Sequence, residues 1–340
     1  MSLAVETLLH PFGNGVLDIN DGKTAFLNAV YHPDISALKG GDLYLQQYFA
    51  PSCNELVQAG FSVSPDIPSK YKSYDFVCIL LPKNMVEARY LMAHGSRLLR
   101  AGGVLVCAAD NKAGGTRLKK LMQKFGFDDL YDDARNKARV VWGIANNLDE
   151  AELNAAILAG EEKPVLGAEF ISQAGIFGWD KIDKGSQILS KYISSDLKGK
   201  GADFGCGYGY LSDFILSHCK KIKQFYCIDA DYRAVELCRK NISKYECKKE
   251  FLWCDLTKPQ DKVANLDFIV MNPPFHNGKK TDISIGQSFI ESAHKSLRRG
   301  GHLWMVANAH LPYEEILKQS SFECNKLHEG QGFKVFCAVK

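Results

Sequence analysis

The sequence lacks every cysteine spacing that would indicate a metal site or a disulfide framework. Its 340 residues include 11 cysteines, an odd number, and no two of them form a C-x-x-C pair. Several of them, such as Cys78, Cys107 and Cys227, lie inside apolar runs that are typical of strands. We therefore expect buried free thiols in a reducing cytoplasm, and no bound metal ion.

Segments that would direct the chain to a membrane are also missing. The stretch MSLAVETLLH has neither the basic start nor the apolar core of a signal peptide, and no apolar run approaches the ~20 residues of a membrane helix. The formal net charge is only +3, which is compatible with an RNA partner but does not require one. We predict a cytoplasmic protein with no membrane partner, and we expect it to be a monomer.

The carboxyl-terminal half shows a regular alternation of strands and helices. With 46% hydrophobic residues, the chain has enough apolar material for two ordinary domains. Strand-like runs cover 200–206, 224–229, 251–255, 266–271, 302–308 and 333–339, and helical patterns cover 210–219, 232–245 and 288–301. Strands separated by helices of this length predict a parallel, doubly wound sheet, here with an antiparallel edge.

The amino-terminal half repeats part of this pattern. The run YDFVCILLPKN leads to LLRAGGVLVCAADN, just as LDFIVMNPPFH leads to SLRRGGHLWMVANAH. Asp75 then corresponds to Asp267, and Leu80 stands where the second copy has Asn272. No glycine-rich loop precedes Leu80. We interpret this as a duplicated domain whose first copy has kept the scaffold and lost the site; the alternative is a chance likeness between two strand–helix–strand units.

The linker between the two copies is predicted within residues 158–170, LAGEEKPVLGAEF. Glycines, a proline and charged residues interrupt the periodic segments there. The sequence therefore predicts two domains, 1–160 and 161–340.

A glycine-rich loop follows the first strand of the second copy. Its glycines, Gly205, Gly207 and Gly209, stand between a strand and a helix. Glycines there let the backbone approach a ligand, and the helix N-terminus supplies oriented N–H groups. The spacing of this glycine loop is G-x-G-x-G with Asp203 ahead of it, which differs from the dinucleotide fingerprint G-x-G-x-x-G. On its own, such a loop is equally compatible with a tight turn.

The next two strands end in carboxylates at the same edge of the predicted sheet. Asp229 ends its strand 20 residues after the glycine loop, where a carboxylate suits the two hydroxyls of a ribose. Asp231 competes for this role, but Asp229 directly ends the apolar run. Asp255 ends the following strand, where a side-chain oxygen suits an adenine amino group; the alternative is a helix cap or a turn residue.

Together these residues resemble the S-adenosylmethionine site of class I methyltransferases. The resemblance implies that Asp203 faces the methionine end of the cofactor and that the glycine loop passes beneath it. It also implies that Asp229 holds the ribose and that Asp255 contacts the adenine.

A further motif follows the fourth strand, where Asn272, Pro273, Pro274 and Phe275 resemble the NPPF signature of amino-methyltransferases. Proline has no backbone N–H, so the two prolines stop the strand and stiffen an extended bend. The resemblance implies that the Asn272 side-chain oxygen and the Pro273 carbonyl accept hydrogen bonds from an exocyclic amine and aim its lone pair at the methyl group. Phe275 would stack on the base. The alternative is a proline-terminated strand with no catalytic role.

Over nearly its whole length the chain resembles a narrower family, the bacterial ribosomal RNA small subunit methyltransferase C. NPPFH, VANAHLPY and FKVFCAVK resemble that family's carboxyl-terminal half, and GIFGWDKIDKGSQIL resembles the segment before its cofactor domain. The resemblance implies an α/β fold of two tandem Rossmann-like class I methyltransferase domains, the first one degenerate. It further implies S-adenosylmethionine-dependent methylation of a guanine N2 amine in 16S rRNA, in the 30S subunit.

Under this resemblance, the domain 1–160 supports RNA docking or the fold, and the domain 161–340 binds the cofactor and catalyses methyl transfer. Two other functions stay open. One is methylation of a guanine N2 in 23S rRNA, a sister family from which Ala309 and Pro312 distinguish this chain. The other is a non-catalytic, RNA-binding assembly factor that retains the cofactor site.

Overall fold

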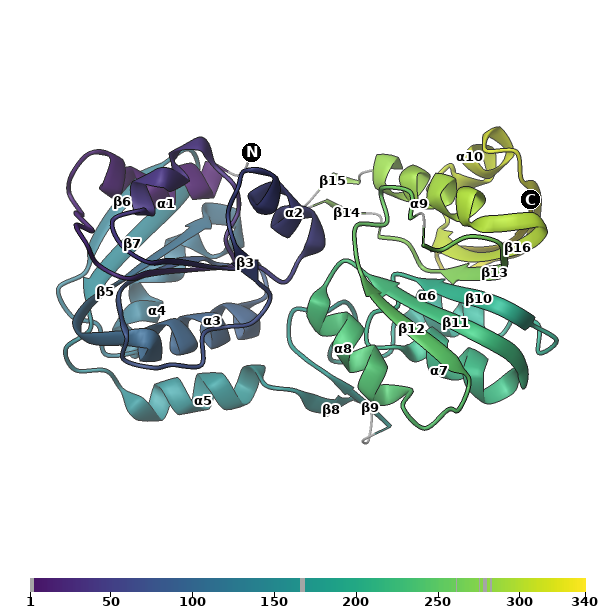
Figure 1. The fold of residues 1–340 in the computed structure, drawn as a ribbon, viewed down its shortest axis with the longest axis horizontal. Helices are drawn as coiled ribbons and strands as arrows, with labels where there is room; N and C mark the ends of the chain where they lie inside the picture. The colour runs from purple at the N-terminus through teal and green to yellow at the C-terminus, as the bar shows by residue number, and fades with distance from the viewer. Residues whose placement is uncertain (1–2, 166–168, 261, 275, 278–279, 282) are drawn as a thin grey trace. The chain divides into compact units, whose positions relative to one another are not determined.

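The chain folds into two compact units, Met1–Glu162 and Lys163–Lys340 (Figure 1). Each unit is an α/β domain around its own seven-stranded sheet. The structure is a computed structural model that describes residues 3–340 except 166–168, 261, 275, 278–279 and 282.

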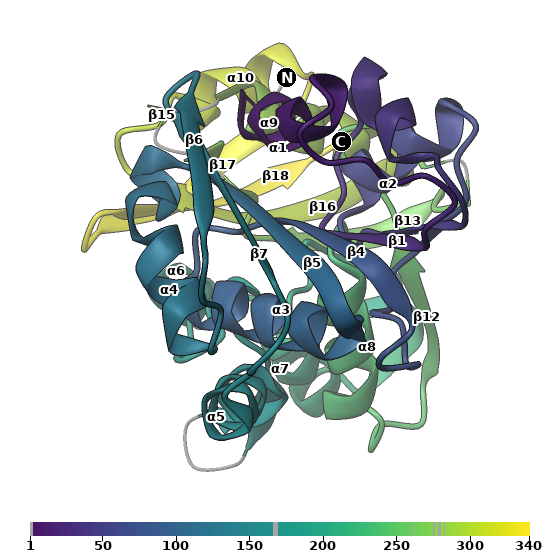
Figure 2. The same ribbon diagram turned by 90° about the vertical axis from the view of Figure 1, so that its left-hand side faces the viewer.

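The first unit has a sheet with strand order β3-β2-β1-β4-β5-β7-β6. Its strands are β1 (Thr24–Leu27), β2 (Leu43–Gln46), β3 (Val63–Ser64), β4 (Tyr74–Leu80), β5 (Leu99–Asp110), β6 (Tyr131–Arg135) and β7 (Ala138–Ile144). Its helices are α1 (Leu3–Gly13), α2 (Ala50–Gln58), α3 (Met85–Leu98), α4 (Leu118–Lys124) and α5 (Glu150–Gly160), with 3-10 turns η1 (Pro33–Leu38), η2 (Asn111–Ala113) and η3 (Gly115–Arg117). Helices α1 and α3 cover opposite faces of the sheet (Figure 2).

The second unit has a sheet with strand order β12-β11-β10-β13-β16-β18-β17. Its strands are β10 (Lys198–Phe204), β11 (Lys221–Asp229), β12 (Lys248–Trp253), β13 (Leu266–Met271), β16 (Leu297–Asn308), β17 (Glu323–Gly330) and β18 (Phe333–Val339). Its helices are α6 (Lys184–Ser190), α7 (Tyr210–His218), α8 (Tyr232–Asn241), α9 (Ile283–Ser296) and α10 (Tyr313–Gln319). Two short antiparallel ribbons accompany them, β8 (Lys163–Val165) with β9 (Phe170–Ser172) and β14 (His276–Asn277) with β15 (Lys280–Thr281).

The two sheets have the same topology. Numbered within its own unit, each runs 3-2-1-4-5-7-6. The first five strands pair in parallel, and the last two join as an antiparallel edge in both units. The predicted fold, an α/β chain with two Rossmann-like domains and an antiparallel edge, is confirmed.

Local details repeat as well. In each unit an aspartate at the start of the fourth strand accepts a hydrogen bond from a lysine backbone N–H at 2.7 Å and pairs with an arginine. These are Asp75 with Lys23 and Arg100 in the first unit, and Asp267 with Lys200 and Arg298 in the second. A polar clasp of this kind, kept in both copies, supports the origin of the two units by duplication.

The central strand β13 of the second sheet is apolar on both faces, as a strand of a sheet covered by helices on each side must be. Met271 and Ile269 of β13 point into one buried cluster, whereas the intervening Val270 and Phe268 point into the other. This alternation leaves only the strand ends for polar chemistry.

Two elements differ from their predicted form. The helix predicted over 288–301 begins earlier and ends at Ser296, because Leu297 already pairs with Leu266 and begins β16. The edge strand β17 was not predicted. It pairs with β18 alone and carries mostly polar side chains, so no apolar run marks it.

All 11 cysteines are free, and seven of them are buried. Cys78, Cys107 and Cys227 are among these seven, as the apolar runs around them predict. Within the described residues, no group of three or more His, Cys, Asp or Glu side chains is arranged to hold a metal ion. Across the same part of the chain, no helix combines the length and the apolar character that spanning a membrane requires.

Candidate active site

The glycine loop connects β10 to α7 and requires glycine at each of its three predicted positions. Gly205, Gly207 and Gly209 have φ values of 78°, 54° and 98°, which L side chains rarely adopt. A Cβ at Gly207 would meet nothing within 4 Å, and one at Gly205 only Phe289 at 3.8 Å. A Cβ at Gly209 would lie 3.2 Å from the Cα of Cys238. The first two glycines therefore border open space, and the third allows α7 to pack against α8.

Asp229 is fixed at the end of β11, directly beside this loop. Its Oδ2 accepts a hydrogen bond from the Gly207 backbone N–H at 2.8 Å, and its Oδ1 accepts one from the Asp231 backbone N–H at 2.9 Å. Burial raises the pKa of the Asp229 carboxyl to about 6, despite these two hydrogen bonds. The carboxyl group is thus held in one orientation at the strand end.

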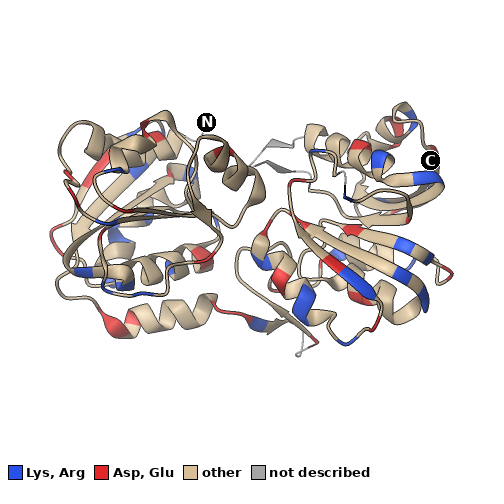
Figure 3. Cartoon of the chain, in the orientation of Figure 1, with Lys and Arg blue, Asp and Glu red and all other residues tan. Residues whose placement is uncertain are grey.

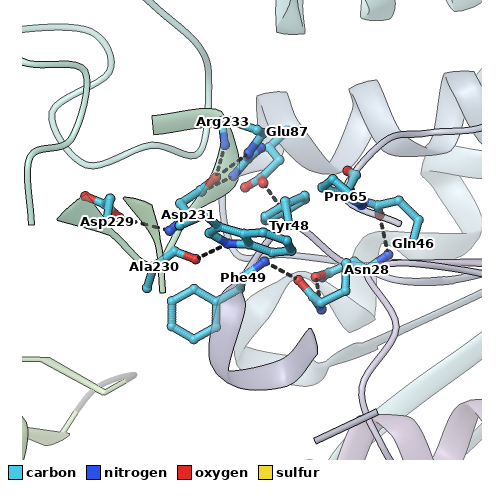
Figure 4. Close-up of polar contacts among 12 residues, drawn as sticks. Asn28, Gln46, Tyr48, Phe49, Pro65, Glu87, Asp229, Ala230, Asp231 and Arg233 are labelled. Atoms are coloured by element: carbon cyan, nitrogen blue, oxygen red, sulfur yellow. Dashed lines mark hydrogen bonds and ion pairs between the residues drawn. The ribbon is translucent and has the colours of Figure 1, made fainter. Parts of the chain in front are cut away.

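Asp231 has a different role from Asp229. It caps α8 by accepting from the Arg233 backbone N–H at 2.9 Å, and its Oδ2 pairs with the Arg233 guanidinium at 2.7 Å (Figure 4). Both oxygens of Asp231 thus serve the start of α8, whereas Asp229 is bonded to the glycine loop itself. A ribose contact of Asp229 stays a prediction.

Asp203 lies beneath the loop and is only 1% exposed. The Ser212 hydroxyl donates to its Oδ2 at 2.7 Å, while its Oδ1 has no hydrogen-bond partner within the described residues. Burial raises the pKa of this carboxyl to about 7. A buried, unpartnered carboxylate oxygen is costly, which points to a use for it beyond packing.

Asp255, just beyond β12, holds a turn. Its Oδ1 accepts from the Thr257 backbone N–H at 2.9 Å and from the Thr257 hydroxyl at 2.5 Å. Its Oδ2 lies 3.9 Å from the Lys258 ammonium. The turn role that the sequence left open is therefore present, and contact with an adenine stays a prediction.

Asn272 follows β13 and has its amide held from one side. Its Nδ2 donates to Asp183 Oδ2 at 2.8 Å and to Ser186 Oγ at 3.0 Å. Both N–H groups of the amide are thereby engaged, which fixes the position of the Asn272 Oδ1 acceptor. Pro273 is buried and Pro274 is exposed, and the strand stops at this bend as its prolines predict.

A cleft brings the glycine loop and Asn272 together. Phe177 stands at its rim with 61% of its surface exposed. Phe275, the predicted stacking residue, lies outside the described residues. The cleft is lined by Phe177, Gly178, Asp183, Ser186, Gly205, Cys206, Gly207, Tyr208, Tyr210, Leu211 and Asn272.

Aromatic and amide contacts fasten the segment before α6 to the rest of the unit. The Phe170 ring lies 5.7 Å from the Tyr208 ring and 5.9 Å from the Tyr210 ring, measured between centroids. Asn241 exchanges hydrogen bonds with the backbone of Ile171, each at 2.8 Å, and donates to the Tyr208 carbonyl at 2.7 Å. Asp183 and Ser186 belong to the segment that follows, so these contacts help to place them.

Asp183 and Ser186 were missed as site residues. The Asp183 side chain caps α6 by accepting from the Ser186 backbone N–H at 2.8 Å. An aspartate directly before a helical segment is a capping signal that the sequence contains. That signal predicts the helix start, but not the contact with Asn272, which lies 89 residues further along the chain from Asp183.

Comparison with known proteins gives consistent matches. A family model described as the methyltransferase small domain matches residues 167–337. The chain is 30% identical over 296 residues to the ribosomal RNA small subunit methyltransferase C of Acinetobacter baylyi, covering 86% of this chain and 85% of that protein. It is 28% identical over 268 residues to the protein of the same name from Vibrio vulnificus, covering 78% and 77%.

A solved structure matches the fold of the whole chain. This is the T. thermophilus 16S rRNA N2 G1207 methyltransferase (RsmC) in complex with AdoMet and guanosine, with a TM-score of 0.79 and 22% sequence identity. The match covers 100% of this chain and 92% of that one, so it extends over both units. From the family model and the curated relatives, we conclude that the chain belongs to the ribosomal RNA small subunit methyltransferase C family.

Proposed function

We propose that this chain transfers a methyl group from S-adenosylmethionine to the exocyclic N2 amine of a guanine in 16S rRNA, presented within the 30S subunit. One observation carries the proposal: Asn272, with both amide N–H groups engaged, borders the same cleft as the glycine loop. An acceptor fixed beside a cofactor cradle suits the activation of an amine. The shared name of the relatives supports the choice of small-subunit rRNA.

The residues of the second unit fit S-adenosylmethionine. Gly205 and Gly207 leave room for a ligand against the backbone, and the Asp229 carboxyl stands at the strand end, where it suits two ribose hydroxyls. The unpartnered Oδ1 of Asp203 suits the positively charged methionine end. When bound, the cofactor would supply a methyl group on a cationic sulfur. The sulfur would keep the electron pair of the carbon–sulfur bond that breaks, and so become a neutral thioether.

The chain contributes orientation and electrostatics to the reaction. An exocyclic amine of a base is a poor nucleophile because its lone pair is spread into the ring. Asn272 Oδ1 and the Pro273 carbonyl accept hydrogen bonds from this amine and favour a pyramidal nitrogen whose lone pair faces the methyl carbon. The nitrogen forms its new bond to that carbon and then loses a proton to water.

The position of the cleft demands that the base leave its stack. A cleft at the ends of strands cannot admit a base that is still paired within a helix, so the nucleotide is extruded or already single-stranded. Phe177 offers an exposed ring at the rim on which such a base can stack. We propose the same stacking role for Phe275.

We propose that the first unit docks RNA or supports the fold of the chain, and that the chain works as a cytoplasmic monomer. Charges of both signs are interspersed over each unit (Figure 3). One stretch of the first unit is different, because no acidic residue lies between Asn111 and Phe127. The exposed basic residues of this stretch are Lys112, Arg117, Lys119, Lys120 and Lys124. Such a stretch suits contact with phosphates.

The proposal is tested by methylating 30S and 50S particles that lack these modifications, using tritiated S-adenosylmethionine. The labelled RNA is digested to nucleosides, and the label is identified. N2-methylguanosine in 30S particles is the expected product. N6-methyladenosine, or label in 50S particles alone, would overturn the assignment. A chain that binds both cofactor and 30S particles without transferring label would instead be an assembly factor.

A further inference from the structure

Asp183 presents two different oxygens to its surroundings. Its Oδ2 accepts from the Asn272 amide and from the Ser186 backbone N–H, each at 2.8 Å. Its Oδ1 takes part in neither of these hydrogen bonds, and the residue is half-buried in the lining of the cleft. The cleft is therefore lined by a carboxylate whose second oxygen is not used to hold Asn272.

This pair of groups reads the edge of a purine. On guanine, the N2 amine stands next to N1–H, so the edge offers hydrogen-bond donors on two adjacent atoms. On adenine, the N6 amine stands next to N1, which is an acceptor. If the amine of either base contacts Asn272, the neighbouring ring atom faces Asp183. A carboxylate oxygen accepts from guanine N1–H, whereas it repels the lone pair of adenine N1.

We propose that Asp183 is the residue that selects guanine over adenine in this site. The inference rests on the proposed function, and it supplies what the amine acceptors alone do not, since two acceptors and a stacking ring suit either base. Discrimination of this kind is strong, because the wrong base leaves a charged acceptor unpaired in the closed site.

Asp183 also couples base selection to chemistry. The same carboxylate that receives N1–H holds the Asn272 amide through its other oxygen. A base whose N1–H binds Asp183 therefore also stabilises the orientation in which the Asn272 oxygen accepts from the amine. Asp183 thus positions Asn272 while it contacts the base.

The decisive variant is Asp183→Asn, which keeps the size of the side chain and its ability to cap a helix. With its amide oxygen toward Asn272 and the Ser186 N–H, the new side chain directs an NH2 group into the cleft. This reverses the hydrogen bond offered to position N1. Ser186→Ala removes the other contact of Asn272 and leaves the Asp183 carboxylate in place. Asp180→Asn makes the same chemical change as Asp183→Asn at an exposed position outside the cleft lining.

The probes are guanosine and 2-aminopurine riboside, which both carry an amine at C2 but differ at N1, a donor in the first and an acceptor in the second. Their affinities are measured by NMR titration of the full chain saturated with S-adenosylhomocysteine. We expect the wild type and Asp180→Asn to prefer guanosine by on the order of tenfold or more. Asp183→Asn should lose or invert the preference, and Ser186→Ala should keep it while slowing methyl transfer to 30S particles.

A wild-type chain without a preference for guanosine would overturn the inference, and so would a preference unchanged in Asp183→Asn. Failure of the proposed function would be seen separately, as the wrong nucleoside or the wrong particle labelled by the wild type. Normal transfer to 30S guanine together with an unchanged preference in Asp183→Asn would remove only the role of Asp183.

Discussion

The two units differ where their strands end. In the second unit, β10 runs into the glycine loop and β11 ends in Asp229. At the corresponding register position of the first unit, Gln47 follows β2. Both side chains accept from the backbone N–H two residues on, Asp229 from Asp231 at 2.9 Å and Gln47 from Phe49 at 2.8 Å. The local architecture has been kept, and the charge has been lost.

Side-chain amides occupy the place of the glycine loop in the first unit. Gln47, which is 1% exposed, donates from Nε2 to the Ala29 carbonyl at 2.7 Å. Asn28, which follows β1, donates from Nδ2 at 2.7 Å to the carbonyl of Leu80, the counterpart of Asn272. The first unit thus keeps its sheet but has hydrogen-bonded amides where the second unit has its glycine loop, which supports our proposal that it binds no cofactor.

A third amide, that of Gln46, lies at the same edge of the sheet (Figure 4). Gln46 accepts from the Asn28 backbone N–H at 2.9 Å and donates to the Pro65 carbonyl at 2.9 Å. Its polar atoms are buried but satisfied, so the filled edge is stable. The second unit leaves Asp203 Oδ1 without a partner among the described residues, whereas the amides at this edge of the first unit are paired with one another and with the backbone.

The two units also differ in their buried carboxyl groups. Asp203 of the second unit corresponds by strand register to Phe26 of the first, and Asp229 corresponds to Gln47. Both carboxyl groups with raised pKa values thus have uncharged counterparts. The second unit keeps two groups that cost stability at neutral pH, which is expected if they serve a ligand.

We expect the largest functional difference between the two units at Asn272. Asn272→Ala removes the oriented acceptor, and we expect methyl transfer in single turnovers to slow by on the order of a hundredfold or more. Cofactor affinity should stay nearly unchanged, because we propose that this residue contacts the amine of the base and not the cofactor. The matched variant in the first unit, Asn28→Ala, should transfer at the wild-type rate per folded molecule. A normal rate in Asn272→Ala would remove this residue from the mechanism.

The glycine loop gives a test of the open space. Gly207→Val places a side chain where the cofactor is expected, and we predict that calorimetric binding of S-adenosylmethionine disappears. Gly332→Val is the control, since Gly332 also has a positive φ of 86° and open space around it but lies in the turn between β17 and β18. Both variants carry similar backbone strain. Equal affinities in the two would show that the loop does not border the ligand.

The buried carboxyl groups of the second unit should make the stability of the chain depend on pH. Since the folded-state pKa of Asp203 is about 7 against an ordinary value of 3.8, the folded chain holds an extra proton between those values, and stability falls as pH rises through this window. From pH 5 to pH 7 this amounts to on the order of 2–3 kcal/mol. Asp203→Asn should reduce the dependence in urea unfolding to the part that the raised pKa of Asp229 contributes, whereas Phe26→Leu should leave it unchanged. Parallel curves for wild type and Asp203→Asn would refute the assignment.

The amide hydrogen bonds of Gln47 in the first unit should contribute to the stability of the chain and not to catalysis. Gln47→Ala leaves the Ala29 carbonyl and the Phe49 N–H unpaired, and we expect the free energy of unfolding to fall by about 1–3 kcal/mol. Gln123→Ala, at an exposed position of α4, should change it by much less. A Gln47→Ala chain as stable as wild type would mean that the amide is not part of the support.

The sequence was sufficient for elements whose signal is local. The run Leu266–Met271 was predicted as a strand with its bounds, as was Phe333–Val339, because continuous apolar residues bounded by turn formers mark buried strands. The glycine loop and the prolines of the NPPF motif were also recognised from their own chemistry. Their ligand roles stay predictions.

Contacts between distant segments could not be predicted from the sequence. The pairing of Asn272 with Asp183, and of Asn28 with Leu80 52 residues away, depends on how the sheet brings segments together. Nothing in the composition of either segment announces the partner. For the same reason, the sequence showed that the first unit lacks a glycine loop, but not that side-chain amides fill its place.

The central claim is that one unit of two keeps an open cofactor site. Calorimetric titration of S-adenosylmethionine into the full chain tests it most directly, with wild type, Asp229→Ala and Gln47→Ala measured side by side. We expect one cofactor bound per chain in wild type and in Gln47→Ala, and loss of binding in Asp229→Ala. Two cofactors per chain, or binding that survives Asp229→Ala and fails in Gln47→Ala, would contradict it.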